Sequence, residues 1–183
     1  MSNIALHLGY ISILLLAAGL AFVVLKWPRG IQYTFSQHVT LKNSSTVFYS
    51  LLFLITLPLL FAFFYFSFVP RLHLQVAFTI ILAISCITQI LCTFLPERDQ
   101  TRTKVHRILA GISALCLPVL LSLLVTSSSV NTVGRITSLV GLLIMVTILY
   151  LAVFTRFRST HALMLQIVYN LAFFLPILFI AYL

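Results

Sequence analysis

The sequence predicts an all-α membrane protein: a six-transmembrane-helix bundle with both termini on the non-cytoplasmic side. Three observations lead to this fold class. Hydrophobic residues make up 62% of the 183 residues and charged residues only 7%, whereas a soluble domain carries about a quarter charged residues. The apolar residues gather in six long runs between short polar segments. The basic residues fall almost entirely in alternate loops.

Each apolar run contains about 20 residues or slightly more, enough for a helix to cross a hydrocarbon layer of about 30 Å. Helices are expected because lipid cannot satisfy exposed backbone groups and because the runs lack the alternation of barrel strands. The six runs and their short loops use all 183 residues, so no further soluble domain is expected. We therefore treat residues 1–183 as a single six-helix transmembrane domain. The helices are expected over residues 4–27, 47–69, 74–95, 105–125, 136–157 and 161–183.

The placement of Lys and Arg predicts the orientation, because short cytoplasmic loops carry an excess of these residues. Only Arg71 and Arg135 fall in the loops after the second and fourth runs. The loops after the first, third and fifth runs should therefore be cytoplasmic, in the plasma membrane of a prokaryote or in an endomembrane of a eukaryote. These three loops contain Lys26, Arg29, Lys42, Arg98, Arg102, Lys104, Arg107, Arg156 and Arg158.

The net charge of +9 favours membrane lipids with anionic headgroups as partners, and not nucleic acid, because the cations flank apolar spans. At the expected starts of the second, fourth and sixth helices, basic residues stand beside hydroxyl residues that are candidate helix caps. Helix N-termini attract phosphate, although caps and orientation bias alone also produce this pattern. The candidate headgroup-binding residues are Lys42, Arg102, Lys104, Arg107, Arg156 and Arg158.

The acidic residues are few: Glu97 and Asp99 follow the third run. A hairpin between the third and fourth helices would bring Asp99 toward His106, and a carboxylate with an imidazole can perform general acid–base catalysis. Asp99 and His106 are therefore the catalytic candidates, with His38 and His161 as further members. The alternative is a loop that neutralises its own charges through nearby arginines. No metal site is expected, since the histidines lack ligand spacing.

Apart from the helix ends, the runs contain no Asp, Glu, Lys or Arg. Pumps and ion-coupled transporters rely on such residues within the bilayer, and a transmembrane haem needs a histidine there. These classes are therefore disfavoured, and no cofactor is expected. In the sixth run, Gln166, Tyr169 and Asn170 share one helical face. We expect them to form hydrogen bonds between helices.

The even-numbered runs each contain a proline in a similar setting: Pro58, Pro118 and Pro176. This spacing is consistent with three related hairpins packed around a common axis, or with chance.

The longest loop contains Ile31, Phe35 and Val39 at a spacing of four residues. This pattern is consistent with a short helix at the membrane surface, or with a loop packed on the helix ends.

Two segments carry a family resemblance. Tyr33-Thr34-Phe35-Ser36-Gln37 before an apolar helix, and Phe94-Leu95-Pro96-Glu97-Arg98-Asp99 followed by His106, resemble motifs of the domain of unknown function 998 family. This family belongs to a wider group that includes the DRAM autophagy modulators. The resemblance implies a six-helix bundle and marks Ser36, Pro96, Asp99 and His106, but implies no reaction. An additional residue, Leu95, and Pro58 depart from the family pattern.

Three functions follow from these observations. The first is a polytopic membrane protein that engages anionic lipid headgroups through its basic cytoplasmic face. The second is a membrane-embedded lipid hydrolase or transferase that uses Asp99 and His106. The third is a scaffold subunit, in a homo-oligomer or in a larger membrane complex.

Overall fold

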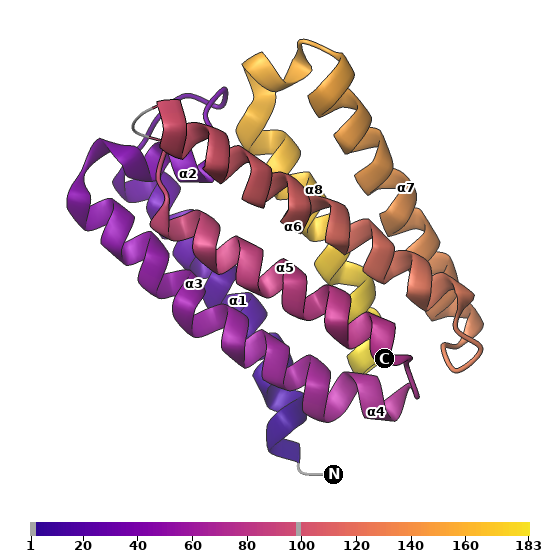
Figure 1. Ribbon diagram of the computed structural model, residues 1–183. Coiled ribbons are helices and arrows are strands. Elements are labelled where there is room, and N and C mark those ends of the chain that lie inside the picture. The colour runs from indigo at the N-terminus through magenta and orange to yellow at the C-terminus, as the bar shows by residue number, and fades with distance from the viewer. Residues whose placement is uncertain (1–2, 98–99) are drawn as a thin grey trace.

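A computed structural model describes residues 3–97 and 100–183, and within these residues the chain is helical with no strands (Figure 1). Six helices are long, and four elements are short. The long helices are α1 (Asn3–Lys26), α3 (Asn43–Phe63), α5 (Val76–Phe94), α6 (Gln100–Thr126), α7 (Thr132–Phe154) and α8 (Phe157–Tyr182). The short elements are α2 (Phe35–His38), the 3-10 turn η1 (Val39–Leu41), the π-helical turn η2 (Phe64–Phe68) and α4 (Val69–Arg71).

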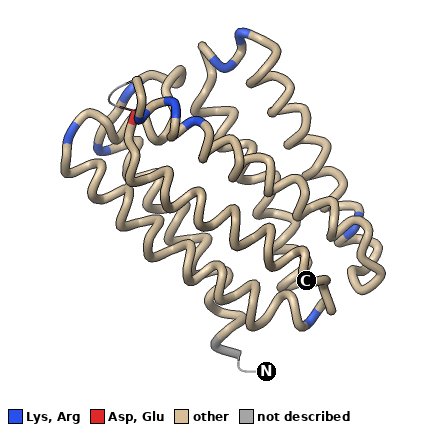
Figure 2. The backbone as a smooth tube through the Cα atoms, in the orientation of Figure 1, with Lys and Arg blue, Asp and Glu red and all other residues tan. Residues whose placement is uncertain are grey.

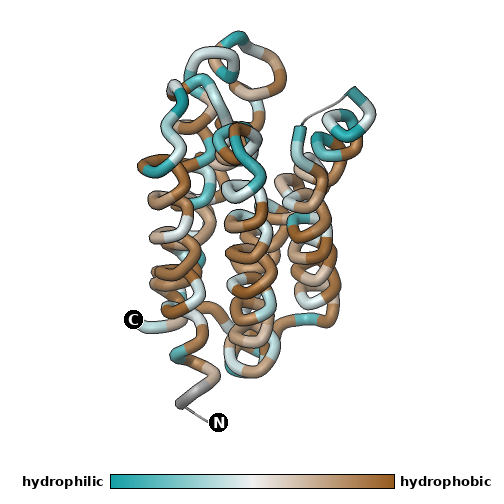
Figure 3. Tube along the Cα trace, turned by 90° about the vertical axis from the view of Figure 1, so that its left-hand side faces the viewer, coloured by the Kyte–Doolittle hydropathy of each residue, from teal (hydrophilic) through white to brown (hydrophobic). Residues whose placement is uncertain are grey.

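Six helical segments are long and apolar enough to cross a membrane, which confirms the predicted number of spans. The second of them continues from α3 through η2 and α4, over Asn43–Arg71. Such a set of helices fits an integral, multi-pass membrane protein. Figure 3 shows hydrophobic residues along the helices, with many of the hydrophilic residues near one end of the bundle.

Four helices begin earlier than the apolar runs indicate. The structure starts α3 at Asn43, α6 at Gln100, α7 at Thr132 and α8 at Phe157, whereas the sequence predicted 47, 105, 136 and 161. In each case a polar first turn extends the helix beyond its apolar part. For α7 the cause is local: the Asn131 side chain accepts a hydrogen bond of 2.7 Å from the Gly134 N–H and caps the helix.

Consecutive spans lie side by side, and α8 also contacts α1 and α6 (Figure 1). Large side chains fill the space between the helices. The aromatic rings of Phe63, Phe64, Phe78 and Phe173 are completely or almost completely buried. A packed apolar core therefore occupies the centre of the bundle.

Two helix prolines leave backbone carbonyls that a neighbouring helix approaches. Pro118 has no N–H for the carbonyl of Ala114, four residues earlier, and the hydroxyl of Tyr169 on α8 donates to that carbonyl. Pro176 leaves the carbonyl of Ala172 free in the same way. There the backbone of α7 comes so close that a Cβ on Gly141 would overlap the carbonyl oxygen. The interhelical bond expected of Tyr169 is thus confirmed.

A second tyrosine joins the two ends of the chain. The Tyr182 hydroxyl accepts a hydrogen bond of 3.0 Å from the Tyr10 N–H and donates one of 2.5 Å to the Leu6 carbonyl. These two backbone groups are partners in the regular i to i−4 pattern of α1. The hydroxyl therefore lies within the hydrogen-bond ladder of α1, and Gly9 provides space for it.

Candidate functional site

The loops that follow α1, α5 and α7 lie together at one end of the bundle, opposite the two termini (Figure 1). Most of the Lys and Arg residues gather at this end, which we call the basic end (Figure 2). Arg71 ends α4 and Arg135 lies in the first turn of α7 (Thr132–Phe154), and these helix ends lie at the other end of the bundle (Figure 1). The grouping of the basic loops is therefore as the sequence predicted. In the described part of the chain, the basic end carries Lys26, Arg29, Lys42, Arg102, Lys104, Arg107, Arg156 and Arg158.

Residues 28–42, which we call the end plug, fold onto the helix ends. The Thr34 side chain caps α2, and the Thr34 N–H donates a hydrogen bond of 3.0 Å to the side-chain oxygen of Gln37. The Phe35 N–H donates to Gln166 Oε1 on α8 at 2.9 Å. Phe35 and Val39 are buried, but Ile31 is 55% exposed. The plug thus packs on the helix ends, and it includes the short helix α2 followed by the turn η1.

Two residues within the plug, Arg29 and His38, contact its backbone. Arg29 donates to the Gln37 carbonyl at 2.7 Å, and its guanidinium lies 4.1 Å from the centroid of the Tyr33 ring. The completely buried His38 places its Nδ1 2.9 Å from the Thr34 carbonyl, while its Nε2 has no partner among the described residues. Because a carbonyl only accepts, Nδ1 carries the proton.

A buried polar cluster joins the plug to the α5–α6 hairpin. The Glu97 side chain, only 8% exposed, accepts a hydrogen bond of 3.1 Å from Gln37. Its other oxygen lies 3.8 Å from His106 Nε2, and Arg107 approaches within 3.5 Å. The carboxylate described beside His106 is therefore Glu97. The sequence paired His106 with Asp99 instead, and Asp99 lies outside the described residues.

The His106 ring closes the end of α5. Nδ1 lies 3.0 Å from the carbonyl oxygen of Cys92 and 2.9 Å from that of Leu95. Both carbonyls lie at the end of α5, where backbone donors are scarce, although the Cys92 carbonyl also accepts a hydrogen bond of 3.2 Å from the Leu95 N–H. Since both groups only accept, the Nδ1 proton points to them. His106 therefore acts as a cap of α5, which accounts for its burial.

Cys92 also contacts this ring, which makes a thiol, an imidazole and a carboxylate neighbours. Its sulfur lies 3.3 Å from Nδ1 and 3.5 Å from Nε2 of His106. Nearly equal distances place the sulfur beside the ring, not along the lone pair of one nitrogen. A nucleophile and its base need that alignment. The arrangement therefore favours packing and capping over catalysis.

The predicted headgroup-binding residues are all exposed. Arg107 lies 3.5 Å from Glu97, and the set is distributed over the plug, the first turns of α6 and the α7–α8 turn. The structure thus brings them to one end of the molecule without forming a closed pocket. The exposed set is Lys42, Arg102, Lys104, Arg107, Arg156 and Arg158.

The α7–α8 turn adds aromatic residues that the sequence reading missed. Every residue from 153 to 160 is exposed, including Phe154 at 73%. Phe157 stacks on His161 with 4.4 Å between ring centroids, and the backbone at His161 is not helical. Two phenylalanines therefore alternate with Arg156 and Arg158 along this exposed turn. Phe154 and Phe157 belong to the fifth apolar run, and nothing in that run distinguished them as part of an exposed turn.

The remaining predicted residues do not assemble into one site. His38 is buried within the plug, and His161 lies near the α7–α8 turn. Among the described residues, no three His, Cys, Asp or Glu side chains form a group that could hold a metal ion.

The two segments that carry the family resemblance do meet, through the bond between Gln37 and Glu97. Ser36, Pro96 and His106 are buried near this contact. Comparison of the chain with protein-family models, with curated proteins and with solved structures returned no match.

Proposed function

We propose that this protein binds anionic phospholipid headgroups through its basic end, with the α7–α8 turn as the principal contact. One observation carries the proposal: Arg156 and Arg158 are exposed in the same turn as the exposed rings of Phe154 and Phe157. Cations that pair with phosphate, beside rings that enter the headgroup boundary, are the combination found in interfacial membrane anchors.

The electrostatics of the basic end support the same function. Each Lys or Arg near an anionic surface contributes about 1 kcal/mol of attraction. Among the described residues, the opposing charge at this end comes from Glu97, which Arg107 and Gln37 already occupy. Lys42, Lys104 and the two arginines of the turn therefore present positive charge toward the headgroups.

The enzyme alternative has less support from the geometry. His106 directs the proton of Nδ1 to two backbone carbonyls, and its side chain is only 6% exposed. A lipid hydrolase would need this imidazole to face a bound substrate.

Binding is tested with nanodiscs that contain phosphatidylcholine alone or phosphatidylcholine with phosphatidylglycerol. Native mass spectrometry then counts the phosphatidylglycerol molecules retained by the protein. Replacing Arg156 and Arg158 together by Gln should weaken retention about fivefold for each charge removed, and added salt should reduce the difference.

Two control variants separate the role of charge from its position. The variant with Arg156 and Arg158 replaced by Lys keeps the charge and should retain most of the binding. Arg135→Gln removes a charge at the opposite end and should leave retention at the wild-type level. Equal retention by wild type and the double Gln variant, at low salt, would refute the proposal and leave the scaffold role as the better explanation.

We further propose that the basic end faces the cytoplasm, following the excess of Lys and Arg in its loops. Cysteines introduced at Ser128 and Ser159, which are exposed at opposite ends, can be labelled with an impermeant maleimide on intact cells. The Ser128→Cys variant should react at once and Ser159→Cys only after permeabilisation. The reverse order would overturn this orientation.

A further inference from the structure

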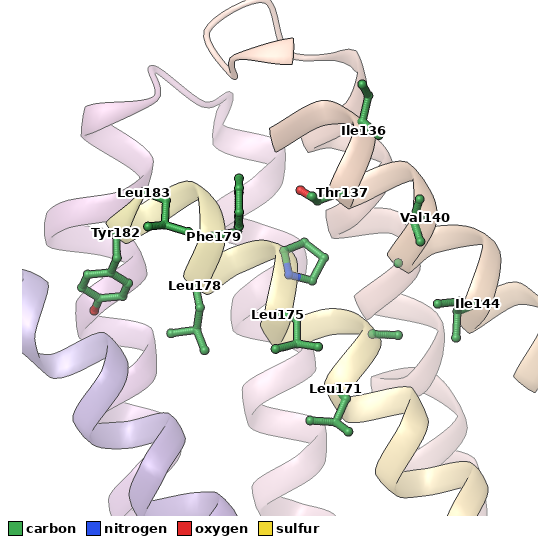
Figure 4. Close-up of a pocket in the computed structure, with 13 residues that line it drawn as sticks. Ile136, Thr137, Val140, Ile144, Leu171, Leu175, Leu178, Phe179, Tyr182 and Leu183 are labelled. Atoms are coloured by element: carbon green, nitrogen blue, oxygen red, sulfur yellow. The ribbon is translucent and has the colours of Figure 1, made fainter. Parts of the chain in front are cut away.

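An apolar groove lies between α7 and α8, toward the end of the bundle opposite the basic end (Figure 4). Its volume is about 600 Å³, and Gly141, Ala172 and Pro176 form a buried floor with little side-chain bulk. Exposed side chains rise on either side of this floor. They include Ile136, Val140 and Ile144 on α7, Leu171 and Leu175 on α8, and Leu183 directly after α8.

We propose that this groove holds one acyl chain of a membrane lipid from the leaflet opposite the basic end. The position in the membrane is the first argument. The part of the groove from Leu171 to Leu183 rises about 18 Å at about 1.5 Å per residue. Half of the hydrocarbon core is about 15 Å thick, so the groove extends through about one leaflet.

The chemistry of the lining is the second argument. Two lining side chains carry hydroxyls, and both are occupied elsewhere: Thr137 donates to the Gly134 carbonyl at 3.0 Å, and Tyr182 bonds to the backbone of α1. Neither hydroxyl therefore has a free proton to donate to an occupant. The occupant that fits is hydrocarbon, which needs no polar partner.

The packing of α7 argues against a second protein helix in the groove. Helices in membranes associate through small residues that allow close approach of their backbones. In α7 these residues already face α8: Gly141 meets the Ala172 carbonyl, and a Cβ on Gly134 would lie 2.8 Å from Ile180. The exposed rims carry branched side chains instead. A flexible acyl chain can follow this shape, whereas a straight helix about 10 Å wide would rest on the rims.

The site is independent of the proposed headgroup binding, because it lies at the other end of the molecule and involves no charge. It is tested with a phosphatidylcholine that carries a diazirine midway along one acyl chain, incorporated into nanodiscs with the full-length protein. After irradiation, peptide mapping locates the adducts. We expect at least about threefold more adduct on Val140, Ile144 and Leu175 than on Leu139 and Leu143, since the groove holds the chain in contact on several sides.

Two matched variants sharpen the test. Val140→Phe places a ring over the floor of the groove and should remove the enrichment. Leu143→Phe enlarges a side chain that is as exposed to lipid as Val140 but does not line the groove, and it should leave the enrichment unchanged. Even labelling of all side chains at this depth would mean ordinary surrounding lipid only and would overturn the proposal. Protection of both rims, together with crosslinked dimers, would assign the groove to a second copy and would also overturn it.

Discussion

Replacing Tyr169 by Phe removes only the hydroxyl that donates to the Ala114 carbonyl. Pro118 cannot supply an N–H to that carbonyl, and the hydrocarbon core contains no water to replace the lost bond. Hydrogen bonds between membrane helices contribute about 0.6 kcal/mol on average and up to about 1.7 kcal/mol. Because no alternative donor is present, the loss should be near the upper value: Tyr169→Phe should lower the free energy of unfolding by about 1.5 kcal/mol.

The effect of Tyr169→Phe on stability should depend on which residue stands at position 118. In the Pro118→Ala background, the new N–H can bond to the Ala114 carbonyl within α6, so Tyr169→Phe should cost about 1 kcal/mol less. The free energy of unfolding is measured in mixed micelles with increasing dodecyl sulfate, followed by circular dichroism. Tyr150→Phe removes an exposed hydroxyl and should change stability by less than about 0.5 kcal/mol. If Tyr169→Phe lowers the free energy of unfolding by the same amount in both backgrounds, within about 0.3 kcal/mol, the bond to the Ala114 carbonyl does not explain the stabilisation by the Tyr169 hydroxyl.

Three further changes can be measured in the same way. Gly141→Ala forces a Cβ against a backbone oxygen of α8 and should destabilise the protein by about 1–3 kcal/mol. Gly111→Ala adds a Cβ with nothing within 4 Å and should stabilise the protein by about 0.5–1 kcal/mol. Similar values for the two variants would contradict the packing described. His106→Leu removes the imidazole donor from the Leu95 carbonyl and leaves the Cys92 carbonyl with the Leu95 N–H alone. It should cost about 1–3 kcal/mol, with faster amide exchange confined at first to the α5–α6 hairpin. Tyr182→Phe should speed amide exchange at Tyr10, and unchanged exchange there would show that the hydroxyl is not needed in α1.

The spans could be predicted because they depend on composition alone. A run of about 20 apolar residues leaves the backbone no alternative to a helix in lipid. The first turns of the helices were missed for the same reason. Gln100 and Thr132 begin helices although they are polar, since a helix continues past the hydrocarbon wherever its backbone can be capped or hydrated.

The buried cluster at the basic end shows what the sequence could not provide. Cys92 and His106 are fourteen positions apart, and their contact depends on how α5 and α6 pair. The sequence predicted Asp99 as the carboxylate near His106, and the carboxylate that the structure describes there is Glu97. Spacing alone does not decide which acidic residue of a short loop lies near a given side chain, because this depends on the path of the backbone.

The three prolines illustrate the limit of a pattern. Their similar settings are consistent with related hairpins, yet Pro118 and Pro176 are buried while Pro58 is exposed. The structure also treats two of the freed carbonyls differently, with a tyrosine hydroxyl in one case and a close backbone in the other. The position of a proline in the sequence identifies which carbonyl lacks its hydrogen bond within the helix. The group that approaches this carbonyl depends on which helix lies alongside.

The hydroxyl of Tyr182 has a consequence for biosynthesis. It completes the hydrogen-bond ladder of α1 from a position 172 residues away from Tyr10. At about 5–20 residues per second, a ribosome needs about 10 to 30 s to make the intervening chain. Throughout that time the first helix is in the membrane with its Leu6–Tyr10 turn in another state, either closed on itself or bound to something else. The beginning of the protein therefore reaches its final structure only after the sixth span has been inserted.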